Sequence, residues 1–110
     1  MPKYTVMMLC AEWCAVCREM RPAWDAAAQG DPERRFVWLD IEDDADRLGD
    51  IDVETFPTIA VLRDGAPHFF GIVPPNIKAV ERLLDPTLAA QAITARDRGW
   101  LEHLAEEFGD

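Results

Sequence analysis

A chain of 110 residues, of which 49% are hydrophobic and 29% charged, is long enough to bury the core of one domain and too short for two. Its formal net charge of −10 opposes electrostatic attraction to phosphate backbones and to anionic lipids, so we expect no nucleic-acid partner and no membrane partner. The three cysteines lie between residues 10 and 17, too close together to join distant parts of a fold. That leaves redox chemistry, a metal site or inert packing for them.

The first apolar run covers only residues 6–11. A membrane-spanning helix needs about 20 apolar residues, and no small-residue cleavage site follows the run as it would in a signal peptide. A cytoplasmic location is therefore the default expectation.

Strand and helix patterns alternate along the first half of the chain. Residues 4–10 are almost continuously apolar, which is typical of a strand covered on both faces. After Cys14 the apolar residues are spaced by four, four and three, which predicts an amphipathic helix: Val16, Met20, Trp24 and Ala27. Gly30-Asp31-Pro32 ends this helix, and residues 36–41 form a second buried strand. Strand, helix and strand together imply a parallel crossover.

The second half predicts a hairpin between two further helices. Residues 43–49 allow only a short helix, and residues 58–62 and 69–73 are strands joined by the turn signal Asp64-Gly65. A helix opens after Pro74-Pro75-Asn76 and closes at Asp85-Pro86. The order β-α-β-α-β-β-α indicates an α/β fold with helices on both faces of a sheet.

Residues 88–108 form a helical tail that we expect to be divided by Gly99. An apolar stripe marks its second half: Trp100, Leu101, Leu104 and Phe108. We expect residues 87–110 to be an extension that packs on the domain formed by residues 1–86. The alternative is a dimer or partner contact through the tail.

Cys14 and Cys17 have the spacing of a redox pair. Cys14 stands at the predicted N-terminus of a helix, where unpaired N–H groups and the helix dipole favour a thiolate, and Cys17 lies one turn further on. A thiolate that attacks a disulfide forms a mixed disulfide, which the second thiol then resolves. We therefore expect thiol exchange at this pair.

Metal binding is the alternative for the cysteines. A tetrahedral zinc site needs four ligands, and only the isolated His68 and His103 are left to complete one. The spacing Cys10-x3-Cys14-x2-Cys17 also matches the iron-sulfur loop of radical SAM enzymes, but that family uses a much larger partial barrel, and Cys10 belongs to a buried strand. We treat this match as coincidence and expect no metal and no cofactor.

The segment Ala11-Glu12-Trp13-Cys14-Ala15-Val16-Cys17-Arg18 resembles the active-site segment of the thioredoxin family, and the resemblance extends over about residues 3–86. It implies a thioredoxin-like fold, a central four-stranded mixed sheet flanked by helices, here with a shortened N-terminus and an extra C-terminal helical tail. Pro22 falls where the family helix is kinked. Phe56-Pro57-Thr58 is similar to the family's cis-proline loop, and Gly71 falls where the family keeps a small residue beside it.

The resemblance implies that Cys14 is the attacking and Cys17 the resolving cysteine of a thiol-disulfide oxidoreductase. The implied substrate-binding residues are Trp13, Ala15, Val16, Phe56, Pro57, Thr58 and Gly71. Protein disulfides would be the substrates, and a reductase or glutathione would supply the electrons. The alternative is a thioredoxin-fold protein-binding module with a secondary redox role or none.

Several residues depart from the family pattern. Met8 and Trp38 stand where thioredoxins carry a buried aspartate and a lysine that assist proton transfer at the resolving cysteine, so we expect a slower or more selective reductant. Ala15-Val16 replaces the family's Gly-Pro and leaves the redox potential open. Cys10 replaces an aromatic residue, and we expect it to be a small buried hydrophobe, with a third redox partner for Cys14 as the alternative.

Overall fold

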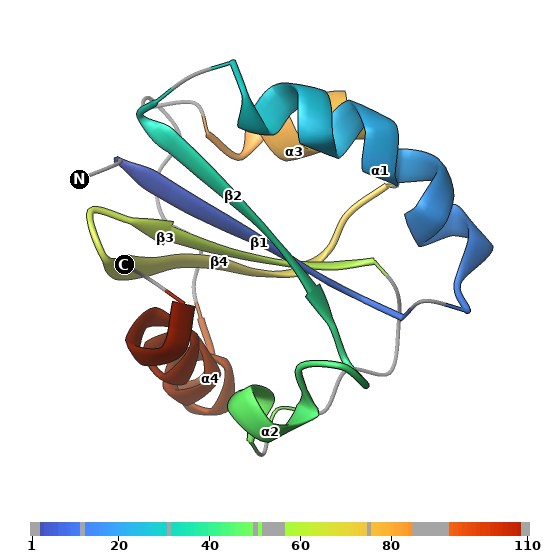
Figure 1. The fold of residues 1–110 in the computed structure, drawn as a ribbon. Helices are drawn as coiled ribbons and strands as arrows, with labels where there is room; N and C mark the ends of the chain where they lie inside the picture. The colour runs from blue at the N-terminus through green and yellow to red at the C-terminus, as the bar shows by residue number, and fades with distance from the viewer. Residues whose placement is uncertain are drawn as a thin grey trace.

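A four-stranded sheet forms the centre of the molecule, with the strand order β2-β1-β3-β4 (Figure 1). The computed structural model describes residues 3–11, 13–30, 32–49, 51, 57–74, 76–84 and 93–108. The strands are β1 (Tyr4–Cys10), β2 (Arg34–Asp40), β3 (Thr58–Arg63) and β4 (Ala66–Ile72). β1 pairs parallel with β2 and antiparallel with β3, which pairs antiparallel with β4. The predicted mixed sheet and parallel crossover are confirmed.

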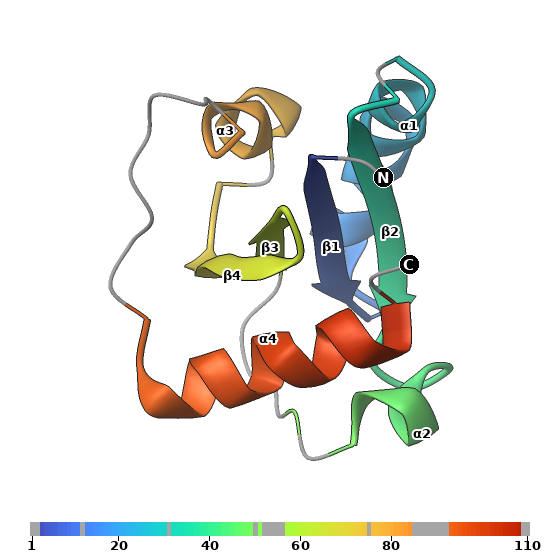
Figure 2. The same ribbon diagram turned by 90° about the vertical axis from the view of Figure 1, so that its left-hand side faces the viewer.

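Every residue of β1 is buried, because helices cover both faces of the sheet. α1 (Ala15–Ala28) and α3 (Ile77–Arg82) lie on one face, and α2 (Ala45–Leu48) and α4 (Ala95–Phe108) lie on the other (Figures 1 and 2). Side chains of a strand alternate between faces. The even-numbered residues of β1 therefore join one core cluster and Met7 and Leu9 join a second.

α1 packs its apolar stripe on β2. Trp24 is fully buried and meets Phe36 and Trp38 edge to face, with ring centroids 5.0 and 5.9 Å apart. Edge-to-face contacts at this separation are favourable beyond the burial of area alone. Pro22 lies inside the helix, as its position in the sequence suggested.

The hairpin of β3 and β4 turns at Asp64 and Gly65. Both residues have positive φ, 53° and 82°, which a two-residue hairpin turn of the primed type requires and which Asp-Gly adopts readily. α3 then begins after Asn76, whose side chain accepts a hydrogen bond from the backbone N–H of Lys78 at 2.8 Å.

α4 runs unbroken through Gly99, so the expected division of the tail at this residue is wrong. A glycine costs a helix about 1 kcal/mol relative to alanine. The burial of Leu101, Leu104 and Phe108 against the sheet outweighs that cost. Trp100 adds an edge contact with Phe70 at 5.6 Å between ring centroids, and Arg47 of the α2 helix lies 4.1 Å over the ring of Phe108.

Within the described ranges, no helix has the length and apolar character needed to cross a bilayer.

Candidate thiol-disulfide site

Cys14 is the N-cap residue, immediately before α1. Its backbone is extended, with φ −84° and ψ 108°, and its N–H donates to the carbonyl of Ala11 at 2.9 Å. Its own carbonyl accepts from the N–H of Arg18 at 3.2 Å, which closes the first helical turn. The thiol is free and half-buried, and its side chain makes no capping hydrogen bond. The nucleophile predicted from the sequence therefore lies at the positive end of the helix dipole.

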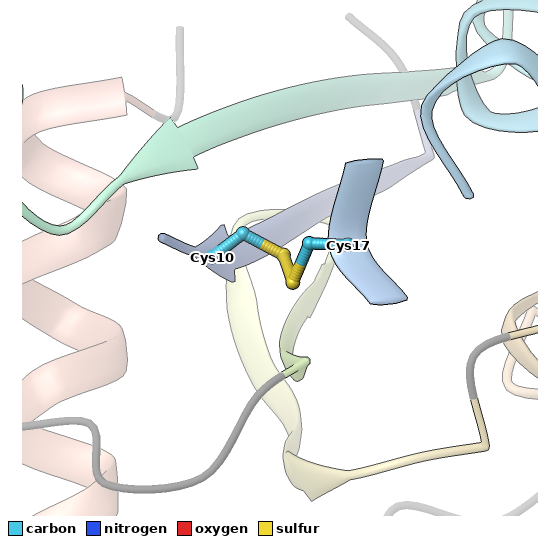
Figure 3. The surroundings of a disulfide bond; sticks show 2 residues. All are labelled: Cys10 and Cys17. Atoms are coloured by element: carbon cyan, nitrogen blue, oxygen red, sulfur yellow. A yellow bond between two sulfur atoms is a disulfide. The ribbon is translucent and has the colours of Figure 1, made fainter. Parts of the chain in front are cut away.

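Cys17 lies in the first turn of α1 and is fully buried. It is joined by a disulfide to Cys10, the last residue of β1, with 6.1 Å between the two Cα atoms (Figure 3). That separation lies within the usual range for disulfides of about 4.4 to 6.8 Å. The bond ties the start of the helix to the end of the central strand.

The bond to Cys10 differs from the pair that sequence reasoning singled out. Cys10 is fully buried, as expected, but it is a disulfide partner of Cys17 and not merely a small hydrophobe. The alternation of side chains along β1 was the signal that could have indicated this pairing. Cys10 and Met8 lie on the same face of the sheet, and α1 covers that face. The roles of Cys14 as attacking thiol and Cys17 as resolving thiol remain a prediction.

An apolar layer lies beneath the cysteines. Met8 and Trp38, which the family resemblance places at the positions of a buried aspartate and a lysine, are register partners on β1 and β2. Met8 is fully buried, and Arg21 lies 4.6 Å over the ring of Trp38. The acidic residue in register with Cys10 is Asp40, whose carboxylate accepts from two backbone N–H groups of the following turn at 2.8 and 3.1 Å. Asp40 is thus engaged in shaping that turn.

Exposed apolar side chains flank Cys14. Trp13 and Val16 are 63% and 41% exposed, and Ala15 between the cysteines is also exposed. The indole N–H of Trp13 donates to Glu42 at 3.2 Å. Large apolar side chains left in water commonly mark a contact surface.

Thr58, in the described part of the proline loop, lies beside the end of β4. Pro57 and Thr58 are buried, and Thr58 pairs with Ile72, which is 61% exposed and was not singled out from the sequence. Gly71 pairs with Ile59, and a Cβ placed on Gly71 would lie 3.2 Å from the ring of Phe69. That distance is shorter than ordinary van der Waals contact, so the ring of Phe69 would have to shift slightly to accept a side chain at Gly71. Phe56, and with it the peptide bond before Pro57, lies outside the described residues.

Three features together define a thioredoxin-fold protein. The sheet is mixed and has this strand order, a half-buried cysteine precedes the first helix, and a proline directly precedes β3. The comparisons with known proteins agree. The family model described as Thioredoxin matches residues 2–77, and the chain belongs to the thioredoxin family.

Among curated relatives, the thioredoxin of Mycoplasmoides gallisepticum is 26% identical over 76 residues, which cover 67% of this chain and 76% of that protein. Mitochondrial thioredoxin-3 of Saccharomyces cerevisiae is 33% identical over 55 residues, covering 50% of this chain and 43% of the relative. This chain spans less than half the length of the plant and yeast relatives that it matches.

Solved structures show the same fold. The oxidised form of mitochondrial thioredoxin 3 from Saccharomyces cerevisiae aligns with a TM-score of 0.62 and 28% identity, covering 74% of this chain and 76% of that one. The thioredoxin of Fasciola hepatica aligns with a TM-score of 0.62 over 74% of this chain and 79% of its own, at 25% identity.

Proposed function

We propose that this chain is a thiol-disulfide oxidoreductase that reduces protein disulfides, with Cys14 as its attacking thiol and Cys17 as its resolving thiol. The observation that carries the proposal is the free thiol of Cys14 at the start of α1, one helical turn from Cys17. A thiolate is the reactive form of cysteine, and the N-terminus of a helix stabilises negative charge.

In the proposed reaction the thiolate of Cys14 attacks one sulfur of a substrate disulfide. The substrate S–S bond breaks, a mixed disulfide forms and the first substrate thiolate leaves. Cys17, as a thiolate, then attacks the sulfur of Cys14 and releases the second substrate thiolate. The substrate gains two electrons and two protons, and the protein is left with one disulfide. A reductase or glutathione returns the electrons in the cytoplasm.

The surface around Cys14 supports a protein substrate. Trp13 and Val16 offer apolar contact beside the thiol, and Pro57, Thr58 and Gly71 are the substrate-facing residues that the family resemblance implies. An extended substrate segment would add its backbone along this loop. Phe56 and Ala15 complete the proposed set.

The apolar pair Met8 and Trp38 supports a slower or more selective reaction than that of an ordinary thioredoxin. No carboxylate stands at the Met8 position to take the proton from Cys17, and an apolar surrounding disfavours a thiolate. The expected result is slow insulin reduction from about pH 6 to about pH 9, because resolution depends on proton acceptors outside the chain. Rates equal to those of an ordinary thioredoxin over this range would contradict the expectation.

Redox titration tests the function itself. The full chain is equilibrated in glutathione buffers of stepped ratio, quenched with acid, and its thiols are counted by mass tagging. A single two-electron step supports the proposal. Three free thiols at every accessible potential would overturn it and favour the binding module, in which the fold holds a partner without exchanging electrons.

A further inference from the structure

The third cysteine, Cys10, lies in the same core cluster as Cys17, and Cys14 packs against that cluster. Cys10 ends β1, Cys17 is in the first turn of α1, and both are fully buried. Their disulfide leaves Cys14 as a free thiol at the surface. Attack by Cys14 and resolution by Cys17 do not account for this arrangement, because they leave a disulfide between Cys14 and Cys17.

We infer that Cys10 is a second resolving thiol. It replaces Cys14 as the disulfide partner of Cys17, so that the oxidised protein holds a buried Cys10–Cys17 disulfide. This inference rests on the proposed reduction of protein disulfides at Cys14. It adds Cys10 to the catalytic residues of that reaction. It also changes which disulfide the oxidised protein holds before the electron donor reduces it.

The added step is an internal exchange. After substrate reduction the protein holds a disulfide between Cys14 and Cys17 and a thiol at Cys10. Cys10, as a thiolate, attacks the sulfur of Cys17, so that the Cys14–Cys17 bond breaks and the Cys10–Cys17 bond forms. Cys14 leaves as a thiolate, and the proton given up by Cys10 balances the charge that appears on Cys14. No electrons enter or leave in this step, and no further oxidant is needed.

The surroundings of the sulfurs favour this direction. The leaving thiolate of Cys14 forms at the N-terminus of α1, the end of a helix dipole that favours negative charge. A stabilised thiolate is the better leaving group in disulfide exchange. The product disulfide is uncharged and lies among the apolar side chains of Met8, Met20 and Trp24. That placement costs less than a buried thiolate.

The burial also determines how the protein is reduced again. An external thiol cannot reach either sulfur of a disulfide whose two residues are fully buried. Cys14 must first attack Cys17 and bring the disulfide back to the surface, where a donor thiolate can attack. The exchange therefore slows the reduction of the oxidised form. While the Cys10–Cys17 disulfide persists, Cys14 stays free to react with other thiol-reactive partners.

Mapping the disulfide in the oxidised wild-type chain tests the inference without any variant. Free thiols are alkylated in denaturant after acid quenching, and the chain is cut at Lys3, Glu12 and Arg18. These cuts separate Cys10, in residues 4–12, from the other two cysteines, in residues 13–18. The expected product is the two peptides joined by a disulfide, with the alkyl group on Cys14.

Two maps would overturn the inference. Separate peptides, with Cys10 alkylated and a disulfide within residues 13–18, would show the ordinary pair and would leave the proposed function standing. Joined peptides with the alkyl group on Cys17 would show that Cys10 pairs with Cys14. If no disulfide forms at any accessible potential, the proposed function fails, which is a different outcome from either map.

Cys10→Ala and Cys10→Val give a second measurement. Each variant is expected to oxidise to a Cys14–Cys17 disulfide, and glutathione should reduce it at least about tenfold faster than the wild-type disulfide because no internal exchange must come first. The native oxidised variants should lose the alkylation of Cys14 that the wild-type protein shows. Equal reduction rates in the wild type and both variants would overturn the inference.

Discussion

The two faces of the sheet differ in chemistry although they are built from the same strands. The core cluster under α1 contains Cys10 and Cys17 together with Met8, Met20 and Trp24, and Cys14 packs against this cluster. The face under α4 is mostly aliphatic, and its buried residues include no cysteine within the described part of the chain. Alternate residues of β1 belong to one face or the other, so neighbours such as Leu9 and Cys10 have different roles.

The two faces also differ in how the helices that cover them are placed. α1 begins close to the end of β1, which is Cys10 (Figure 1). α4 instead packs Leu101, Leu104 and Phe108 on the other face of the sheet. We therefore expect substitutions on the α1 face to alter the reaction and those on the α4 face to alter stability.

Cys14→Ser should have the largest effect on the reaction. Because the hydroxyl is a far weaker nucleophile than the thiolate, insulin reduction should fall by at least about a thousandfold. The thermal midpoint should stay close to that of the wild type, since the side chain is half-buried and makes no capping bond. Substantial remaining turnover would show that another cysteine attacks the substrate.

Leu104→Ala should have the largest effect on stability. Leu104 is fully buried under the sheet, and removing its side chain there should cost about 2 to 5 kcal/mol in the free energy of unfolding. Urea titration measures the loss, and activity per folded molecule should be unchanged. The exposed Glu102 on the same helix provides the control, because Glu102→Ala should change stability by less than about 0.5 kcal/mol. A similar cost for both variants would contradict a core role of α4.

Trp13→Ala should raise KM for a protein disulfide about threefold to tenfold, because the side chain is 63% exposed beside the thiol. The same exposure means that the stability of the protein should change little. Steady-state kinetics with insulin measures KM. Trp13→Phe is the matched control, since it keeps an aromatic ring but removes the donor to Glu42. An unchanged KM in both variants would remove Trp13 from the substrate surface.

His68 should make stability depend on pH. Burial, and then the positive charge of Arg63, lower the pKa of His68 below its ordinary value of 6.5, against an opposing hydrogen bond with the backbone of Leu83. His68 therefore binds a proton more readily in the unfolded chain than in the folded chain. Stability is retained above about pH 6.5 and is lost as the pH falls below it. Urea titrations from about pH 7.5 to about pH 5.5 should show a steeper loss in the wild type than in His68→Gln; equal slopes would exclude His68 as the cause.

Gly99→Ala should have the smallest effect and the opposite sign. Gly99 lies inside α4, and an added Cβ would meet no atom within 4 Å. The helix should gain about 0.5 to 1 kcal/mol of stability from the lower conformational entropy of the unfolded chain. Chemical denaturation measures the gain, and a loss would show that the position needs glycine for a reason other than space.

Much of the fold was predictable because its signals are local. The continuous apolar run before Cys10 and the spacing of Val16, Met20 and Trp24 predicted β1 and α1, and the Asp-Gly signal predicted the hairpin turn. Gly99 misled the prediction, since the cost of one glycine is local whereas the burial of the helix around it is tertiary. Ile72 was missed because its exposure depends on where β4 ends against its neighbours.

At the cysteines the same division holds. The sequence by itself determined that three thiols stand within eight residues, that one begins a helix and that another lies one turn along it. Only the tertiary structure decided that Cys10 faces Cys17. Whether two side chains meet depends on which face of a strand each occupies and on how the next helix crosses that face, and both are set by the packing of the whole sheet.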